Sequence, residues 1–162
     1  MQCRPVRIPS CGMRWAAAAL LAAAPIPAAA HPPAAAVVRA FYRYHFAHEM
    51  AFTRAAVRRR ARWLAPDLLA RCRAYFARSS PADGPPDIDG DPFTDSQEYP
   101  ATFRVGATTR SGDTALVAVR FSWRTGGRRD VTVVLVGARA WRIADVRYAT
   151  GSSLRAELAG GA

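Results

Sequence analysis

A run of acidic residues between positions 87 and 98 is the part of this sequence whose residue types could do chemistry. It reads Asp-Ile-Asp-Gly-Asp-Pro-Phe-Thr-Asp-Ser-Gln-Glu. Counted from the first Asp, carboxylates occupy positions 1, 3, 5, 9 and 12, the ligand spacing of an EF-hand calcium loop. However, Pro92 stands where that loop needs Gly, and the flanking residues do not predict a pair of helices. Three hypotheses stay open. The acids could lie in turns and pair with the arginine-rich helix surface, they could form a substrate or partner surface, or they could bind calcium. The candidate calcium ligands are Asp87, Asp89, Asp91, Asp95 and Glu98.

Two histidines and a distant aspartate form a second candidate group. His48 projects onto the middle of the apolar face of an expected helix, and His45 lies at the edge of that face. A carboxylate beside an imidazole can hold the ring as a general acid or base. His48 and Asp145 would therefore form such a pair if the fold brought them together. The alternative is a core histidine bonded to a backbone carbonyl or a tyrosine hydroxyl.

The elements that must position these side chains are helices in the first half of the chain. Val37, Phe41, Tyr44 and Phe52 fall on one face, which predicts a helix over residues 34–52. A second helical region is expected over residues 54–77, interrupted at Pro66 because proline disfavours helix at the residue before it. Residues 79–100 are rich in Ser, Pro, Gly and Asp and predict a long irregular loop that carries the acids.

Strands follow in the second half. Alternating apolar and polar residues predict strands over residues 101–109, 114–124, 130–136 and 140–150, and a short helix is expected over 153–158. The phase of the apolar residues slips within the last strand, which predicts a β-bulge near Ala144 and Asp145. Helices first and strands afterwards indicate an α+β fold, with the helices packed on a curved antiparallel sheet of about four strands.

The N-terminal segment has the features of a signal peptide. Arginines precede the apolar run of residues 15–24, and Ala28 to Ala30 supply small residues for cleavage before His31. The run is too short to cross a bilayer, and translation could start at Met1 or Met13. We expect residues 31–162 to form a single exported domain, periplasmic or secreted, without a transmembrane segment. Cys72 is the only cysteine after cleavage, so no intrachain disulfide is expected.

The chain is strongly basic. All 23 basic residues are arginine and 12 residues are acidic, which gives a net charge of +11. Such an excess suits an anionic partner. No nucleic-acid-binding motif is present and an exported protein rarely meets nucleic acid, so we expect none as a partner.

Four short motifs carry a resemblance to a known family. They are Phe41-Tyr42-Arg43-Tyr44, Leu64-Ala-Pro-Asp-Leu68, Asp89-Gly-Asp-Pro-Phe93 with Gln97-Glu98, and the segment from Trp141 to Tyr148. Together they resemble DUF3828, a family of exported bacterial proteins to which no activity is attached. The order of helices and strands resembles the wider NTF2-like (cystatin-like) superfamily. This resemblance implies a cone-shaped fold with a pocket between a helix and the sheet, with these lining candidates: Phe41, Tyr44, His45, Trp123 and Tyr148.

The superfamily contains both catalytic and binding members, so the fold alone does not decide the function. The sequence favours a non-catalytic module that binds a small ligand or an envelope protein and needs no cofactor, with calcium left open. The alternative is a cofactor-free lyase or isomerase that uses His48 and Asp145. A homodimer that associates through an exposed strand face is a further hypothesis.

Overall fold

The computed structural model describes residues 33–78 and 88–160, and it confirms the α+β class. The expected signal peptide and the first part of the acidic loop lie outside the described residues. Within them, no helix is both long and apolar enough to cross a bilayer. The elements in chain order are α1 (Ala34–Phe46), α2 (Arg54–Arg60), the 3-10 helix η1 (Ala61–Trp63), α3 (Pro66–Arg78), β1 (Thr102–Ser111), β2 (Thr114–Ser122), β3 (Arg128–Val136), β4 (Arg142–Tyr148) and α4 (Leu154–Leu158).

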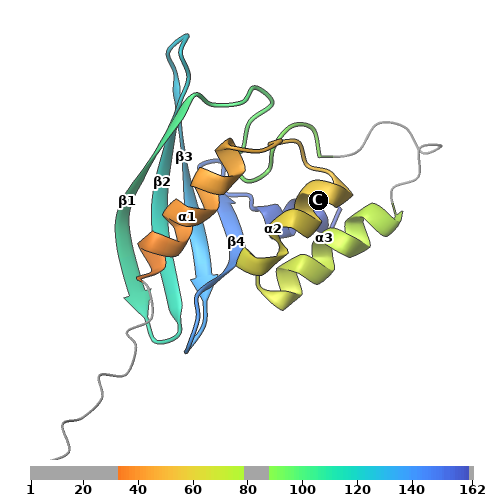
Figure 1. Ribbon diagram of the computed structural model, residues 1–162, viewed down its shortest axis with the longest axis vertical. Helices are drawn as coiled ribbons and strands as arrows, with labels where there is room; N and C mark the ends of the chain where they lie inside the picture. The colour runs from red at the N-terminus through yellow and green to blue at the C-terminus, as the bar shows by residue number, and fades with distance from the viewer. Residues whose placement is uncertain (1–32, 79–87, 161–162) are drawn as a thin grey trace, which may run out of the picture. The chain divides into compact units, whose positions relative to one another are not determined.

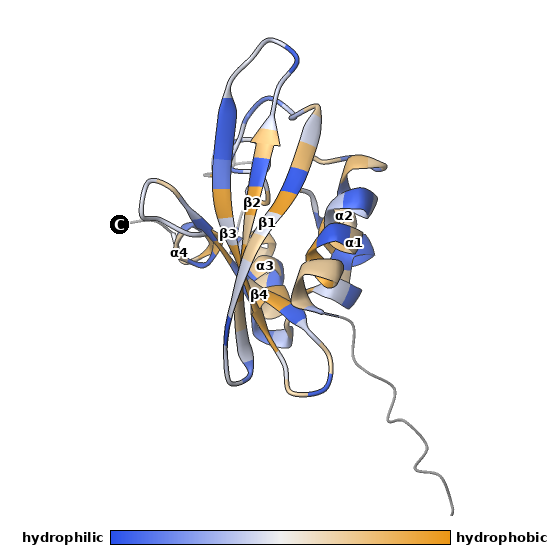
Figure 2. Ribbon diagram, turned by 90° about the vertical axis from the view of Figure 1, so that its left-hand side faces the viewer, coloured by the Kyte–Doolittle hydropathy of each residue, from blue (hydrophilic) through white to orange (hydrophobic). Residues whose placement is uncertain are grey.

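The four strands form one antiparallel sheet in the order β1-β2-β3-β4. Successive residues of a strand point to opposite faces, and Figure 2 shows the resulting alternation of hydrophilic and hydrophobic residues along the strands. On β2 the inner face carries the buried residues Val117, Val119 and Phe121, whereas Ala118 and Arg120 are exposed on the outer face. Helix α1 packs on β1 and β2 (Figure 1).

The predicted bulge in the last strand is confirmed. Val134 pairs with Asp145 and Leu135 pairs with Ile143, so Ala144 is the extra residue on β4. The carboxylate of Asp145 accepts hydrogen bonds from the backbone N–H groups of Val146 at 2.9 Å and Arg155 at 3.0 Å. Asp145 therefore connects β4 to the first turn of α4.

The two edges of the sheet differ. The free side of β4 is covered by Leu64, which forms an isolated bridge with Ile143, and the N–H of Ala65 donates to the carbonyl of Ile143 at 2.7 Å. Ser153 forms a second bridge with Arg147. Strand β1, at the other edge, pairs only with β2 among the described residues.

The first helix is shorter than the sequence predicts. It ends at Phe46, and the prediction of a helix that continues to residue 52 is wrong. The chain turns over residues 47–52, and α2 then begins behind Thr53, whose hydroxyl accepts from the N–H of Ala56 at 3.1 Å. The predicted interruption at Pro66 is confirmed, since η1 ends before it and α3 begins with it.

Aromatic side chains fill the space between α1 and the sheet. Phe41 and Tyr42 are fully buried, and their rings lie within 5.2 Å of the rings of Phe93 and Phe121 respectively. Phe93 comes from the acidic loop, so the loop itself contributes to the core.

Candidate functional site

The most unusual feature of the interior is a line of hydrogen-bonded polar groups, which we call the buried polar chain. It consists of Arg60, His45, Asp91 and Thr94, each at most 1% exposed. Arg60 Nε donates to His45 Nδ1 at 2.7 Å, and His45 Nε2 lies 2.7 Å from Asp91 Oδ2. A guanidinium can only donate, so His45 must accept at Nδ1 and carry its hydrogen on Nε2. The histidine is therefore a neutral bridge between a cation and a carboxylate.

The guanidinium of Arg60 is held on several sides. Besides His45, it donates to the carbonyl oxygens of Ala56 at 3.0 Å and Glu49. Burial lowers the pKa of Arg60, while the charge of Asp91 raises it. Asp91 thus offsets part of the cost of a buried cation, even though the two residues contact each other only through the ring of His45.

The carboxylate of Asp91 also organises its own loop. Asp91 Oδ1 accepts from the N–H of Phe93 at 3.1 Å, and Oδ2 accepts from the hydroxyl of Thr94 at 2.7 Å. The N–H of Asp91 donates to the carbonyl of Ser96 at 2.8 Å and closes the turn. The preceding residue, Gly90, has φ +88°, and a Cβ there would come within 2.5 Å of the carbonyl oxygen of Ser96. Both the backbone conformation and the space at this position require glycine.

Three tyrosines from three elements hold the loop in place. The hydroxyl of Tyr42 in α1 donates to the carbonyl of Phe93 at 2.7 Å, and that of Tyr148 in β4 donates to the carbonyl of Pro92 at 3.0 Å. The hydroxyl of Tyr75 in α3 accepts from the N–H of Ile88 at 3.0 Å. The part of the loop from residue 88 onward is therefore an integral part of the core rather than a flexible rim.

Tyr148 makes a second contact that bears on ionisation. Its hydroxyl lies 3.0 Å from Glu157 Oε2 on α4. The hydroxyl has one hydrogen and lies within hydrogen-bond distance of two acceptors, the carbonyl of Pro92 and the carboxyl group of Glu157. Burial raises the pKa of Glu157, and the hydrogen bond with Tyr148 opposes this effect.

The predicted calcium ligands have other partners. Asp91 belongs to the buried polar chain, Asp95 accepts from Arg129 at 2.8 Å, and Asp89 accepts from Gln97. Glu98 is exposed, and Asp87 lies outside the described residues. In the described parts of the chain, no three His, Cys, Asp or Glu side chains are grouped as metal ligands. The four EF-hand positions that the structure describes, Asp89, Asp91, Asp95 and Glu98, are therefore not gathered around a common centre.

The structure also does not bring His48 and Asp145 together. His48 lies beyond the end of α1, is exposed, and its Nδ1 donates to the carbonyl of Tyr44 at 2.7 Å. Asp145 turns toward α4 because of the bulge, and no hydrogen bond or ion pair between the two residues exists in the described structure. The buried histidine is instead His45. Its partner Arg60 lies in an arginine-rich stretch. The sequence feature that distinguishes Arg60 there is that it follows the apolar Val57 by three residues, which places the two side chains on the same face of a helix.

The described structure does not gather the five pocket candidates around one pocket, since Trp123 borders one surface pocket and Tyr148 another. Phe41 and His45 are stacked in the core with ring centroids 5.5 Å apart. Tyr44 stacks on His48 at the surface, and the indole N–H of Trp123 donates to the carbonyl of Glu98 at 3.0 Å. Among the described residues, every buried side-chain nitrogen and oxygen has a hydrogen-bond partner. The space between α1 and the sheet is thus occupied by aromatic rings and by the buried polar chain.

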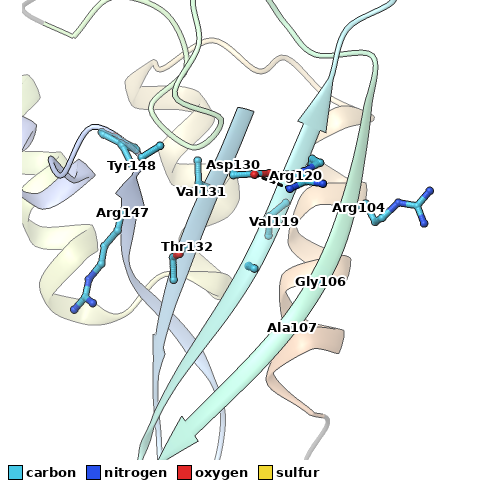
Figure 3. A pocket seen from close by; sticks show the side chains of 12 residues that line it. Arg104, Gly106, Ala107, Val119, Arg120, Asp130, Val131, Thr132, Arg147 and Tyr148 are labelled. Atoms are coloured by element: carbon cyan, nitrogen blue, oxygen red, sulfur yellow. Dashed lines mark hydrogen bonds and ion pairs between the residues drawn. The ribbon is translucent and has the colours of Figure 1, made fainter. Parts of the chain in front are cut away.

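A depression does lie on the outer face of the sheet, and we call it the outer groove (Figure 3). It has a volume of about 430 Å³ and is bordered by arginines on β1, β2 and β4. Its floor consists of small side chains of β1, β2 and β3, namely Ala107, Ala118 and Thr132. The arginines that border it are Arg104, Arg120 and Arg147.

The fold is similar to that of one chain in a solved two-protein complex. The matches are the selenomethionine and native crystal structures of the type VI effector-immunity complex Tae3-Tai3 from Ralstonia pickettii, with TM-scores of 0.54 and 0.51. Both are 24% identical in sequence, cover 72% and 74% of this chain, and cover 97% and 95% of the matched chain.

This level of identity shows the fold alone. No protein-family model and no curated protein matches the chain. The resemblance to DUF3828 and to the NTF2-like superfamily therefore stays a prediction.

Proposed function

We propose that this chain is a non-catalytic protein-binding module that acts as an immunity protein, binding an effector through its surface. The main support for this proposal is that the interior between α1 and the sheet is filled by side chains. The region between α1 and the sheet, where a small ligand or a reaction would have to be accommodated, holds Phe41, Tyr42 and Phe93 together with the buried polar chain. A function that depends on recognition must therefore use the surface.

The structural matches support a protein as the partner. Each matched chain comes from a complex that consists of an effector and an immunity protein. Either component of such a complex binds another protein. The alignment extends over nearly the whole matched chain, so the likeness is not limited to a shared hairpin or helix pair.

The chemistry of the described residues favours the immunity side. The sulfur of Cys72 is fully buried, and burial raises its pKa to about 12, which is unsuitable for a nucleophile. His45 uses both ring nitrogens in the buried polar chain, and His48 donates to its own helix. A chain that inhibits by binding needs none of these groups in reactive form.

Binding to each half of the known complex tests the proposal. Residues 31–162 would be mixed with purified Tae3 and, separately, with purified Tai3, and the complexes measured by size-exclusion chromatography with light scattering and by biolayer interferometry. We expect Tae3 to bind with a Kd below about 1 μM and Tai3 not to bind. Binding to Tai3 alone would place the chain on the effector side, and binding to neither would remove the effector-immunity version of the proposal. An unrelated arginine-rich domain controls for adhesion driven by charge.

We also propose that the chain is exported and meets its partner in the envelope. The N-terminal segment supports this, with an apolar run followed by small residues before His31. Expression of the full chain in a bacterial host, followed by fractionation and intact-mass measurement, should show a periplasmic species that begins at His31. A cytoplasmic species that retains residues 1–30 would contradict export.

A further inference from the structure

We infer that the outer groove binds an extended acidic segment of a protein partner. This inference rests on the proposed function in one respect, namely that the partner is a protein. It adds the surface that is used and the chemistry that this surface recognises.

The strand register places the groove on the exposed face. Arg104, Arg120 and Asp130 are opposite one another on β1, β2 and β3, and the next row on the same face contains Ala118 and Thr132 of β2 and β3 with Arg147 of β4. Val119 and Val131 lie between these rows and point into the core. In Figure 3 the side chain of Arg104 extends outward past β1, and that of Arg147 extends along the side of β4.

Two of the three arginines have free guanidinium groups. Arg120 forms a two-point ion pair with Asp130, with distances of 2.7 and 2.8 Å. Arg104 and Arg147 are exposed and make no side-chain hydrogen bond or ion pair within residues 33–78 and 88–160. They lie at the two sides of the groove, on β1 and β4 (Figure 3). Asp130 is the only acid among the described residues that line the groove, and it is already paired with Arg120, so these residues present uncompensated positive charge.

The chemistry of the groove favours carboxylates on a polypeptide. A guanidinium binds a carboxylate through two parallel hydrogen bonds, which gives both strength and direction. The floor between the arginines consists of Ala107, Ala118 and Thr132, which suit the backbone and short side chains of an extended segment. Tyr148 is the aromatic residue among the described lining residues, but it is only 6% exposed and its hydroxyl is bonded to Pro92 and Glu157. Its ring is therefore not free to stack on a base, as aromatic rings do in proteins that bind single-stranded nucleic acid.

The groove can be altered without touching the core. None of its residues belongs to the buried polar chain, and substitutions at exposed strand positions usually change stability little. Two variants are informative: a double variant, Arg104→Ala with Arg147→Ala, removes the free charges, and Ala118→Tyr fills the groove without changing the charge. The matched control is Arg39→Ala with Arg43→Ala, which removes the same charge from exposed positions on α1.

The first experiment uses a defined probe. A fluorescein-labelled peptide of alternating glutamate and threonine, long enough to follow one strand, is titrated with residues 31–162 and its anisotropy is measured. Each groove variant should bind the peptide at least about tenfold more weakly, and the α1 control should stay within about twofold. Equal losses in the groove variants and the control would show attraction by net charge alone and overturn the inference. Heparin fragments and single-stranded DNA of equal charge serve as competitors, and tighter binding of either in the groove would overturn a protein segment as the occupant.

The second experiment uses the proteins of the complex and separates the two proposals. If the unmodified chain binds Tae3 or Tai3, loss of that binding in the groove variants but not in the control supports the inference. If both groove variants still bind, the inference that the outer groove binds the partner is wrong, and the proposed function is unaffected. If the unmodified chain binds neither protein, the effector-immunity proposal fails. The peptide titration then still tests whether the outer groove binds an acidic segment.

Discussion

Replacement of Asp91 by asparagine is the most direct test of the buried polar chain. Asparagine has nearly the same shape as aspartate but only one oxygen. In the structure one carboxylate oxygen of Asp91 accepts from the N–H of Phe93, and the other accepts from His45 and Thr94. In one orientation of the amide its NH₂ group would face the backbone N–H of Phe93, and in the other it would face the Nε2 hydrogen of His45. A change of the His45 tautomer does not help, because it would set the Nδ1 hydrogen against Arg60.

The expected cost of Asp91→Asn follows from these contacts. One buried donor without a partner costs about 1–3 kcal/mol, and Arg60 also loses the carboxylate that offsets its burial. Breaking a buried charge pair by removing one member costs about 3–5 kcal/mol. We expect a loss near 4 kcal/mol, a large part of the roughly 5–15 kcal/mol that stabilises a typical domain. With a urea m-value of about 1.5 kcal/mol/M, the unfolding midpoint should fall by roughly 2–3 M.

The measurement is urea unfolding of residues 31–162, followed by tryptophan fluorescence and by circular dichroism. Asp130→Asn is the matched control, since that carboxylate is exposed and paired with an exposed arginine, and its loss should change the free energy of unfolding by less than about 1 kcal/mol. An Asp91→Asn variant within about 1 kcal/mol of the parent chain would refute the reasoning.

Three further predictions concern ionisation, reactivity and metal. Burial raises the pKa of Glu157, so the folded state holds this proton more tightly than the unfolded chain, and stability falls as the pH rises from about 4.5 through the folded pKa. Glu157→Gln should remove this loss, so the melting temperature of the variant relative to the parent should increase between about pH 4 and pH 7. A difference in melting temperature that stays constant with pH would contradict this prediction. Cys72 should resist iodoacetamide in the folded chain and react in urea, because it is fully buried with a pKa of about 12; labelling of the native chain at the rate of a free thiol would argue against this burial. Because Asp91 and Asp95 already have partners, EDTA or millimolar calcium should leave the melting temperature unchanged, and stabilisation by calcium would disprove this account of the loop.

The fold was predictable where the pattern is local. Alternation along the strands predicts which residues face the core, and the phase slip between Ile143 and Val146 predicts the bulge that the structure contains. Pro66 similarly marks a helix start. The end of α1 was not predictable in this way, because residues 47–52 contain neither Gly nor Pro, and the cap of α2 at Thr53 is one residue among many that could serve.

The candidate site was less predictable because its contacts join distant segments. His45 and Asp91 are 46 residues apart, and Arg60 is 15 residues from His45. Composition indicated that the acidic loop matters, but it could not show that one of its acids turns inward while Asp95 pairs with β3. The helix projection ranked His48 above His45 because it assumed that the helix continued past Phe46.

The unequal edges of the sheet limit how copies of this chain could join. Backbone groups on a free strand edge are a template for another strand, and here the edge at β4 is closed by Leu64 and Ser153 while β1 has no strand beyond it among the described residues. A sheet with one free edge can accept one further strand and then offers no second site for growth. If two copies paired through β1, the described part of each sheet would have no free edge left for a third copy, because the other edge carries Leu64 and Ser153.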